Sequence, residues 1–172
     1  MQMLYDEAAE GCEQDGVDLM KWKFAIANVL LELPVGMKEM EPERQEIEYP
    51  YEGRPEIILE NPEYDLQLTF SLLDKEMKPE DVRDAIEAVY DLMEEAFPRY
   101  RRTQRYVISE IPIPVGWFLM QMEDLGVEHM KAVFSAEGKM VLLTMTYRAD
   151  ETWKWRVLTK HILASIRIAE AN

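Results

Sequence analysis

The sequence predicts an α+β fold, in which an antiparallel sheet packs with two main helices. Two segments, 79–97 and 151–165, repeat apolar residues at the spacing of an α-helix. Elsewhere, short segments alternate apolar and polar residues and end at turns containing Gly, Pro or Asn, which is typical of strands joined as hairpins. The chain has 172 residues, of which 48% are hydrophobic, so it can bury one core without a disulfide or metal.

The first 19 residues are expected to form an acidic flexible arm, followed by a single α+β domain over 20–172. Residues 1–20 contain six acids and no base, with little apolar periodicity. Cys12, the only cysteine, falls in this arm, so no internal disulfide is expected. The small residues before it loosely resemble the end of a lipoprotein signal, but Glu10 interrupts them, and lipidation is the less favoured interpretation.

Four strands are predicted in the first half of the chain, at residues 20–26, 29–33, 56–60 and 64–73. Ala27–Asn28 and Asn61–Glu63 supply turns between them. Residues 37–54 are rich in Glu and are expected to form a long surface loop with one short strand near 46–49. The last strand alternates, so one sheet face should be apolar and the other should contact water, with Gln67, Thr69 and Ser71 on the wet side.

The helix at 79–97 is the clearest element of the second half. Pro79 suits a first helical turn, Glu80 and Asp81 complement its positive end, and Pro98 stops it. A strand is predicted at 106–111, followed by a meander of three strands at 115–123, 127–135 and 139–148.

The closing helix, 151–165, is predicted to begin at an N-cap on Asp150. Its apolar stripe is expected to contain Trp153, Val157, His161 and Ile162. Residues 166–168 either continue the helix or form a short terminal strand.

This order of elements, with three short phrases, resembles the PsbP-like fold family. The phrases are Phe24–Ala25–Ile26 leading to Leu33–Pro34–Val35–Gly36, the helix after Lys78–Pro79, and the closing run from Trp153 to Ile168. That family includes an extrinsic protein of photosystem II, a Ran-binding nuclear transport factor and bacterial domains of unknown function. The resemblance implies an αβα sandwich over about 20–168 and a binding or assembly role, and it assigns no functional residue.

The acidic charge balance limits the classes of partner that the chain is expected to bind. With 19 basic and 34 acidic side chains the net charge is −15, which disfavours nucleic acid and anionic membranes and favours a basic protein partner, although solubility alone also explains it. The first ten residues carry three acids and no base, and no segment approaches the roughly 20 apolar residues of a membrane span. We therefore expect a cytoplasmic protein.

The candidate binding residues are four arginines and three tryptophans: Arg99, Arg101, Arg102, Arg105, Trp117, Trp153 and Trp155. Arginines beside tyrosines can bind phosphate or stack on bases, but in so acidic a chain we expect them to pair with the Glu-rich loop, 37–54. Tryptophan is over-represented in interface hot spots, and the alternative is that all four tryptophans of the chain belong to the core.

No pattern predicts catalysis, a metal or a cofactor. His129 and His161 have no visible partner, so we expect His161 to pack partly buried and His129 to lie on a strand surface. The methionines that crowd the meander are interpreted as core rather than as a soft-metal site: Met120, Met122, Met130, Met140 and Met145.

The sequence thus favours a non-enzymatic domain that binds a protein or assists assembly, with self-association left open. The alternative is a small enzyme or ligand-binding protein whose site is assembled from scattered polar residues. A deep pocket containing His129 or His161 would favour the alternative, and a filled core would favour binding.

Overall fold

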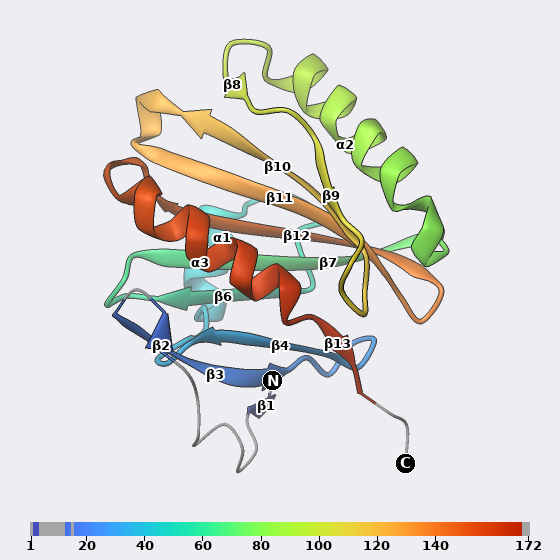
Figure 1. Cartoon of the computed structure of the whole chain (residues 1–172). Coiled ribbons are helices and arrows are strands. Elements are labelled where there is room, and N and C mark those ends of the chain that lie inside the picture. Colours follow the sequence, from blue (N-terminus) through green and yellow to red (C-terminus); the bar gives the residue numbers. More distant parts are fainter. Residues whose placement is uncertain (1, 4–12, 15, 170–172) are drawn as a thin grey trace.

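The computed structural model describes residues 2–3, 13–14 and 16–169, and in it two antiparallel sheets combine with three α-helices (Figure 1). The smaller sheet has the order β1-β3-β4-β13, with β2 also paired to β3. Its strands are β1 (Gln2–Met3), β2 (Glu13–Gln14), β3 (Val17–Lys23), β4 (Val29–Pro34) and β13 (Arg167–Ile168).

The larger sheet has the order β5-β6-β7-β12-β11-β10-β8, and β9 also pairs with β10. Its strands are β5 (Lys38–Glu39), β6 (Ile57–Asn61), β7 (Leu66–Glu76), β8 (Arg101–Arg102), β9 (Tyr106–Ile108), β10 (Val115–Met122), β11 (Val127–Ala136) and β12 (Lys139–Arg148). The predicted meander is therefore confirmed, and so is the α+β class.

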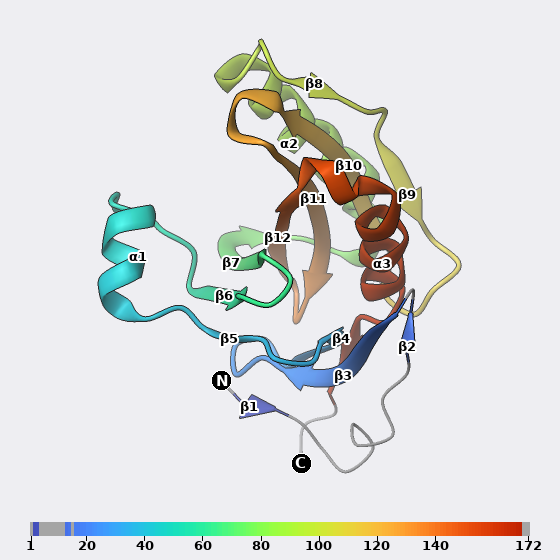
Figure 2. The ribbon, with the colours of Figure 1, turned by 90° about the vertical axis from the view of Figure 1, so that its left-hand side faces the viewer.

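Helices cover both faces of the larger sheet, which makes the predicted αβα sandwich. The helices are α1 (Pro42–Glu48), α2 (Val82–Ala96) after a 3₁₀ turn at Pro79–Asp81, and α3 (Thr152–Ala164) after a 3₁₀ turn at Ala149–Glu151. Figure 2 shows α3 and the smaller sheet on one side of the larger sheet and α1 on the other. No helix within the described part of the chain is long and apolar enough to cross a membrane.

Strict alternation along the strands produces two cores. On the inner face, side chains such as Phe70, Phe134 and Leu143 are buried against α3 and the smaller sheet. On the outer face, Phe118 and Val133 are buried under Ile86 of α2. A one-residue slip in any central strand would exchange the two faces, so the pattern specifies the register.

The N-terminal boundary differs from the prediction, and most of the predicted arm lies outside the described residues, Cys12 included. Strand β3 begins at Val17 rather than Met20, because Val17 and Leu19 are buried in the inner core. Their two-residue spacing shows that the alternation of the strand extends into the acidic segment.

The Glu-rich segment contains more structure than predicted. Instead of a strand near 46–49, it forms α1, with Pro42 in its first turn. No residue of α1 is buried, so the helix has no apolar face to reveal it. Side chains hold it to the sheet: Arg44 pairs with Glu60, and the Tyr49 hydroxyl donates to Gln67 at 3.0 Å.

The closing helix also differs in its buried side. The inner core takes Trp155, Leu158 and Ile162, while Trp153 and Val157 of the predicted stripe are exposed. Asp150 does not cap the helix but forms an ion pair with Arg148.

The chain then leaves α3 and closes the smaller sheet. Of the two alternatives for residues 166–168, the terminal strand is confirmed, because β13 pairs with β4.

Gly116 of β10 lies under α2, where there is no room for a side chain. A Cβ there would stand 2.7 Å from Ile86 Cβ and 3.1 Å from the Val82 carbonyl oxygen. We predict that Gly116→Ala lowers the free energy of unfolding by ~1–3 kcal/mol through overpacking, measured by urea denaturation. Combined with Ile86→Gly, which removes both the Cβ and the Cγ2 that the new methyl would meet, it should cost less than the sum of the two single changes, and additive costs would contradict the clash.

Candidate protein-binding surface

The arginine-rich segment lies at the edge of the larger sheet, between α2 and the turn that joins β10 to β11. Strand β8 pairs with Met120 and Gln121 of β10, which places each arginine beside a carboxylate of the chain itself. The four ion pairs are Arg99–Asp124 at 3.0 Å, Arg101–Glu123 at 3.6 Å, Arg102–Glu94 at 3.1 Å and Arg105–Glu87 at 2.9 Å. The expectation of pairing within the chain is confirmed, but the predicted partner, loop 37–54, is wrong because β8 lies at the other edge of the sheet.

Two of these arginines join the sheet edge to α2. Arg102, with its side chain only 9% exposed, also donates to the carbonyl oxygens of Phe97 and Tyr100. Arg105 and Arg102 both lie over the ring of Tyr90, at 4.5 and 5.2 Å from its centroid. These contacts give Arg102 and Arg105 a structural role in holding α2 to the sheet edge.

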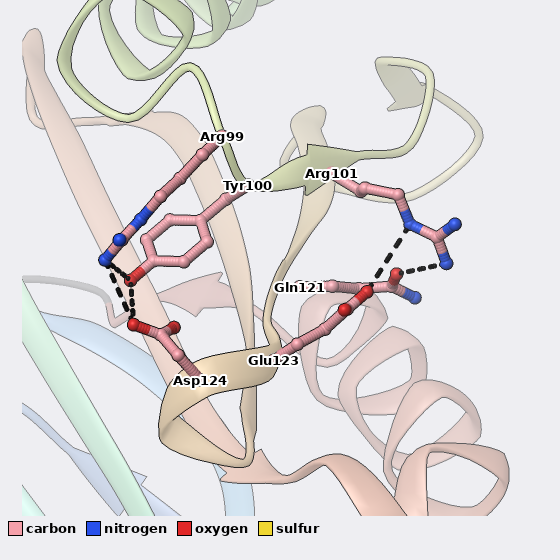
Figure 3. Close-up of a pocket in the computed structure, with 6 residues that line it drawn as sticks. All are labelled: Arg99, Tyr100, Arg101, Gln121, Glu123 and Asp124. Atoms are coloured by element: carbon pink, nitrogen blue, oxygen red, sulfur yellow. Dashed lines mark hydrogen bonds and ion pairs between the residues drawn. The ribbon is translucent and has the colours of Figure 1, made fainter.

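Arg99 and Arg101 line a shallow pocket of about 440 Å³ together with Tyr100, Gln121, Glu123 and Asp124 (Figure 3). Arg99 donates to both the Tyr100 hydroxyl and Asp124, and Arg101 donates to Gln121. Two cations and two carboxylates face one another here, so the pocket has no excess positive charge that would select an anion.

A buried carboxylate connects this pocket to α3. Glu128 is fully buried, and it accepts two hydrogen bonds from Arg156, at 2.6 and 3.0 Å, one from the Tyr147 hydroxyl and one from Gln121. Burial, followed by the bond to Glu128, raises the pKa of Tyr147 far above its usual range, and the bond to Glu128 raises that of Arg156. Sequence reasoning missed this cluster, although Glu128 shares its strand face with Met130 and Ala132, where a charge requires a partner.

The three candidate tryptophans do not form one region. Trp155 is fully buried against Tyr64 and Tyr147. Trp117 is 7% exposed and stacks on Tyr106 with ring centroids 4.7 Å apart. Trp153 alone faces outward, with 70% of its surface exposed.

The outward side of α3 combines apolar and basic groups. Trp153 and the exposed Val157 are one turn apart, and Lys160 follows, with its ammonium 5.9 Å from the ring centroid of Trp117. Trp153, Val157 and Lys160, with the neighbouring Tyr106, are called here the α3 face. No carboxylate among the described residues forms an ion pair with Lys160.

The charge of this helix contrasts with the rest of the chain. Residues 152–168 contain four Lys or Arg, one His and no acid, so all 34 acids lie elsewhere with the other 15 bases. Lys154 lies near Glu151, and Arg156 is held by Glu128, which leaves Lys160 as the outward cation of the helix.

The histidines and methionines are placed by the alternation of the sheet. His161, half-buried on α3, forms a 2.7 Å contact with Glu32 of β4. His129 lies on the outer face of β11 and is half-buried rather than on the surface, so the two histidines are on opposite sides of the sheet. The methionine prediction is confirmed: Met120, Met122 and Met140 belong to the outer core, and Met130 and Met145 to the inner core.

The architecture defines an α+β domain in which helices cover both faces of an antiparallel sheet. Among solved structures, it is similar to cyanobacterial PsbP (CyanoP) from Synechocystis sp. PCC 6803, with a TM-score of 0.62 and 12% identity over 92% of this chain and 97% of that one. It is also similar to LpqN of Mycobacterium tuberculosis, described as involved in cell envelope biogenesis, with a TM-score of 0.50 and 13% identity over 83% and 84%. The chain therefore has a PsbP-like fold, as its sequence indicated. No family model and no curated protein matches it.

Proposed function

We propose that this chain is a non-enzymatic domain that binds a protein partner through the α3 face. One observation carries the proposal: Trp153 is 70% exposed on a helix that has no acid, in a chain of net charge −15. Exposed tryptophan is a residue type that interface hot spots favour, and Lys160 on the same side of the helix has no ion pair within the described part of the chain. The PsbP-like fold supports a binding role by analogy.

The positive charge of the α3 face indicates what kind of protein segment it would bind. Lys160 and the acid-free helix complement an acidic segment that also presents an apolar side chain to Trp153 and Val157. The net charge still opposes nucleic acid and anionic membranes at long range, so neither is proposed as a partner. A second copy of the chain, which has many acids elsewhere, is the self-associating version of the same contact.

The filled cores support binding over catalysis. The aromatic and methionine side chains of both faces are packed, and the two histidines are separated by the sheet, which removes them as a catalytic pair. The single cysteine supports a reducing, cytoplasmic location.

We predict that the paired change Trp153→Ser with Lys160→Glu abolishes capture of the partner while leaving the fold intact. Both side chains are exposed, so thermal unfolding should remain close to that of the wild type. The matched control is Ile47→Ser with Lys38→Glu, which removes an exposed apolar group and a cation near α1. Affinity capture from the native cell with quantitative mass spectrometry should find a protein that falls at least ~10-fold with the first pair, about 1.4 kcal/mol or more, and not with the control.

Light scattering of the purified chain across concentrations separates a second copy from another protein. If every captured protein survives the α3 change, or depends equally on the control pair, the α3 face is not the binding surface. If His129→Ala with His161→Ala removes cellular function while all partners are still captured, the non-enzymatic assignment is wrong.

A further inference from the structure

The outer face of the larger sheet carries a patch of polar side chains between α1 and α2. Lys131 of β11 is opposite Thr144 of β12, which is opposite Thr69 of β7. One step along, His129 is opposite Thr146 in the same way. Helix α2 packs on β10 and β11 and α1 lies beside β6, so the strip over β12 and β7 lies between the two helices (Figure 2).

Lys131 is the cation of this patch. Its ammonium contacts the Thr144 hydroxyl at 3.4 Å, and no carboxylate among the described residues pairs with it, although the chain has 34 acids. Burial lowers the pKa of this half-buried lysine to about 8. A desolvated amine without a counter-charge is costly in a fold, so an anionic ligand at this position would offset that cost.

His129 adds to the patch a polar atom without a hydrogen-bond partner among the described residues. That atom is its Nδ1, which is buried. Burial, and then the charge of Lys131, lower its pKa to about 3, so the imidazole is neutral near pH 7. The patch therefore combines an ammonium, threonine hydroxyls and a neutral imidazole, and no carboxylate among the described residues pairs with the ammonium.

The patch is flanked by polar side chains near α1 and by apolar side chains of α2. On the α1 side, the carboxylates of Glu48 and Glu60 are already held by Arg44, and Gln67 bonds to both Tyr49 and Glu48. On the other side, Glu87 and Glu94 of α2 point to the arginines of the sheet edge, so helical spacing turns Ala85, Ala88 and Leu92 toward β12. Leu92 is 59% exposed there.

We propose that this patch binds a small carboxylic acid with a short apolar chain, its carboxylate on Lys131 and Thr144 and its chain against Leu92. One negative charge supplies the counter-charge that the amine lacks, and the Thr144 hydroxyl, which accepts from Lys131, can donate its own proton to a carboxylate oxygen. The apolar side of α2 distinguishes this ligand from an inorganic anion. The site is separate from the α3 face and does not depend on the proposed partner.

The test follows the ¹⁵Nζ resonance of Lys131 in the whole chain during titration with sodium hexanoate, acetate and inorganic phosphate. Hexanoate is expected to shift that resonance saturably and to bind at least ~10-fold more tightly than acetate, because part of its chain leaves water. Lys131→Met should remain folded, since it removes a desolvated amine, and should reduce affinity at least ~10-fold, as the loss of a charge-assisted hydrogen bond requires. Leu92→Ser should bring hexanoate close to acetate.

The matched control is Lys139→Met, at the start of the same β12 strand, whose lysine pairs with Asp74 and is 41% exposed. It should bind hexanoate as the wild type does. The proposal is overturned if no ligand shifts Lys131 saturably, if phosphate or acetate binds as tightly as hexanoate, or if Lys131→Met and Lys139→Met behave alike.

Discussion

Replacing Arg156 by alanine is expected to lower the free energy of unfolding by about 3–5 kcal/mol, which is what breaking one side of a buried ion pair costs. Glu128 is fully buried, and the guanidinium of Arg156 donates two hydrogen bonds to its carboxylate. Without the guanidinium, the carboxylate keeps only its bonds to Tyr147 and Gln121. Urea unfolding followed by tryptophan fluorescence measures the loss.

Two further variants show whether the buried charge is the cause. Adding Glu128→Gln to Arg156→Ala should restore part of the stability, because the amide keeps an acceptor for Tyr147 and removes the charge. The control, Arg148→Ala, breaks an exposed pair with Asp150 and should cost no more than about 1 kcal/mol. Equal losses for Arg156→Ala and Arg148→Ala would show that Glu128 is not dependent on its partner.

The second large loss of stability is expected at one of the two tryptophans of α3 and not at the other. Trp155→Ala should cost about 3–5 kcal/mol, because the ring is fully buried between Tyr64 and Tyr147 and its removal leaves a cavity. Trp153→Ala, two positions earlier and 70% exposed, should change stability by no more than about 0.5 kcal/mol.

Urea unfolding of both variants tests these two expectations. A large loss for Trp153→Ala would mean that this ring has a structural role and would weaken its place in the α3 face. A small loss for Trp155→Ala would contradict the packing of α3 on the inner core.

Elements with a strong local pattern were predicted closely. The meander strands, β10 to β12, were placed within two residues of their ends, because each alternates and stops at a short turn. Ala27 and Asn28, predicted as a turn, both have positive φ, at 62° and 53°, as a tight hairpin requires. The helix at 79–97 was also placed correctly, since its apolar residues lie on one side.

The candidate site was predicted only in part. The arginines were found as a patch and their pairing within the chain was expected, but their partners on α2 and the β10–β11 turn required the sheet order. Trp153 was named as a candidate binding residue together with Trp117 and Trp155, yet of the three only Trp153 is exposed. Glu128 and Lys131 were not singled out at all, although Glu128 stands on the apolar face of its strand, where a charge requires a partner. Lys131 lies on the more polar face and has no such local signature.

The sequence by itself determined the class of this protein, its PsbP-like order of elements and the two faces of its central strands, because those follow from spacing along the chain. Tertiary structure alone decided which side of α3 is buried, since that helix has apolar residues on more than one side and the sheet selects among them. It alone also decided the partners of Glu128, the arginines and Lys131. An ionisable side chain is assigned its role by the groups that surround it in space, and those come from strands and helices far apart in the chain.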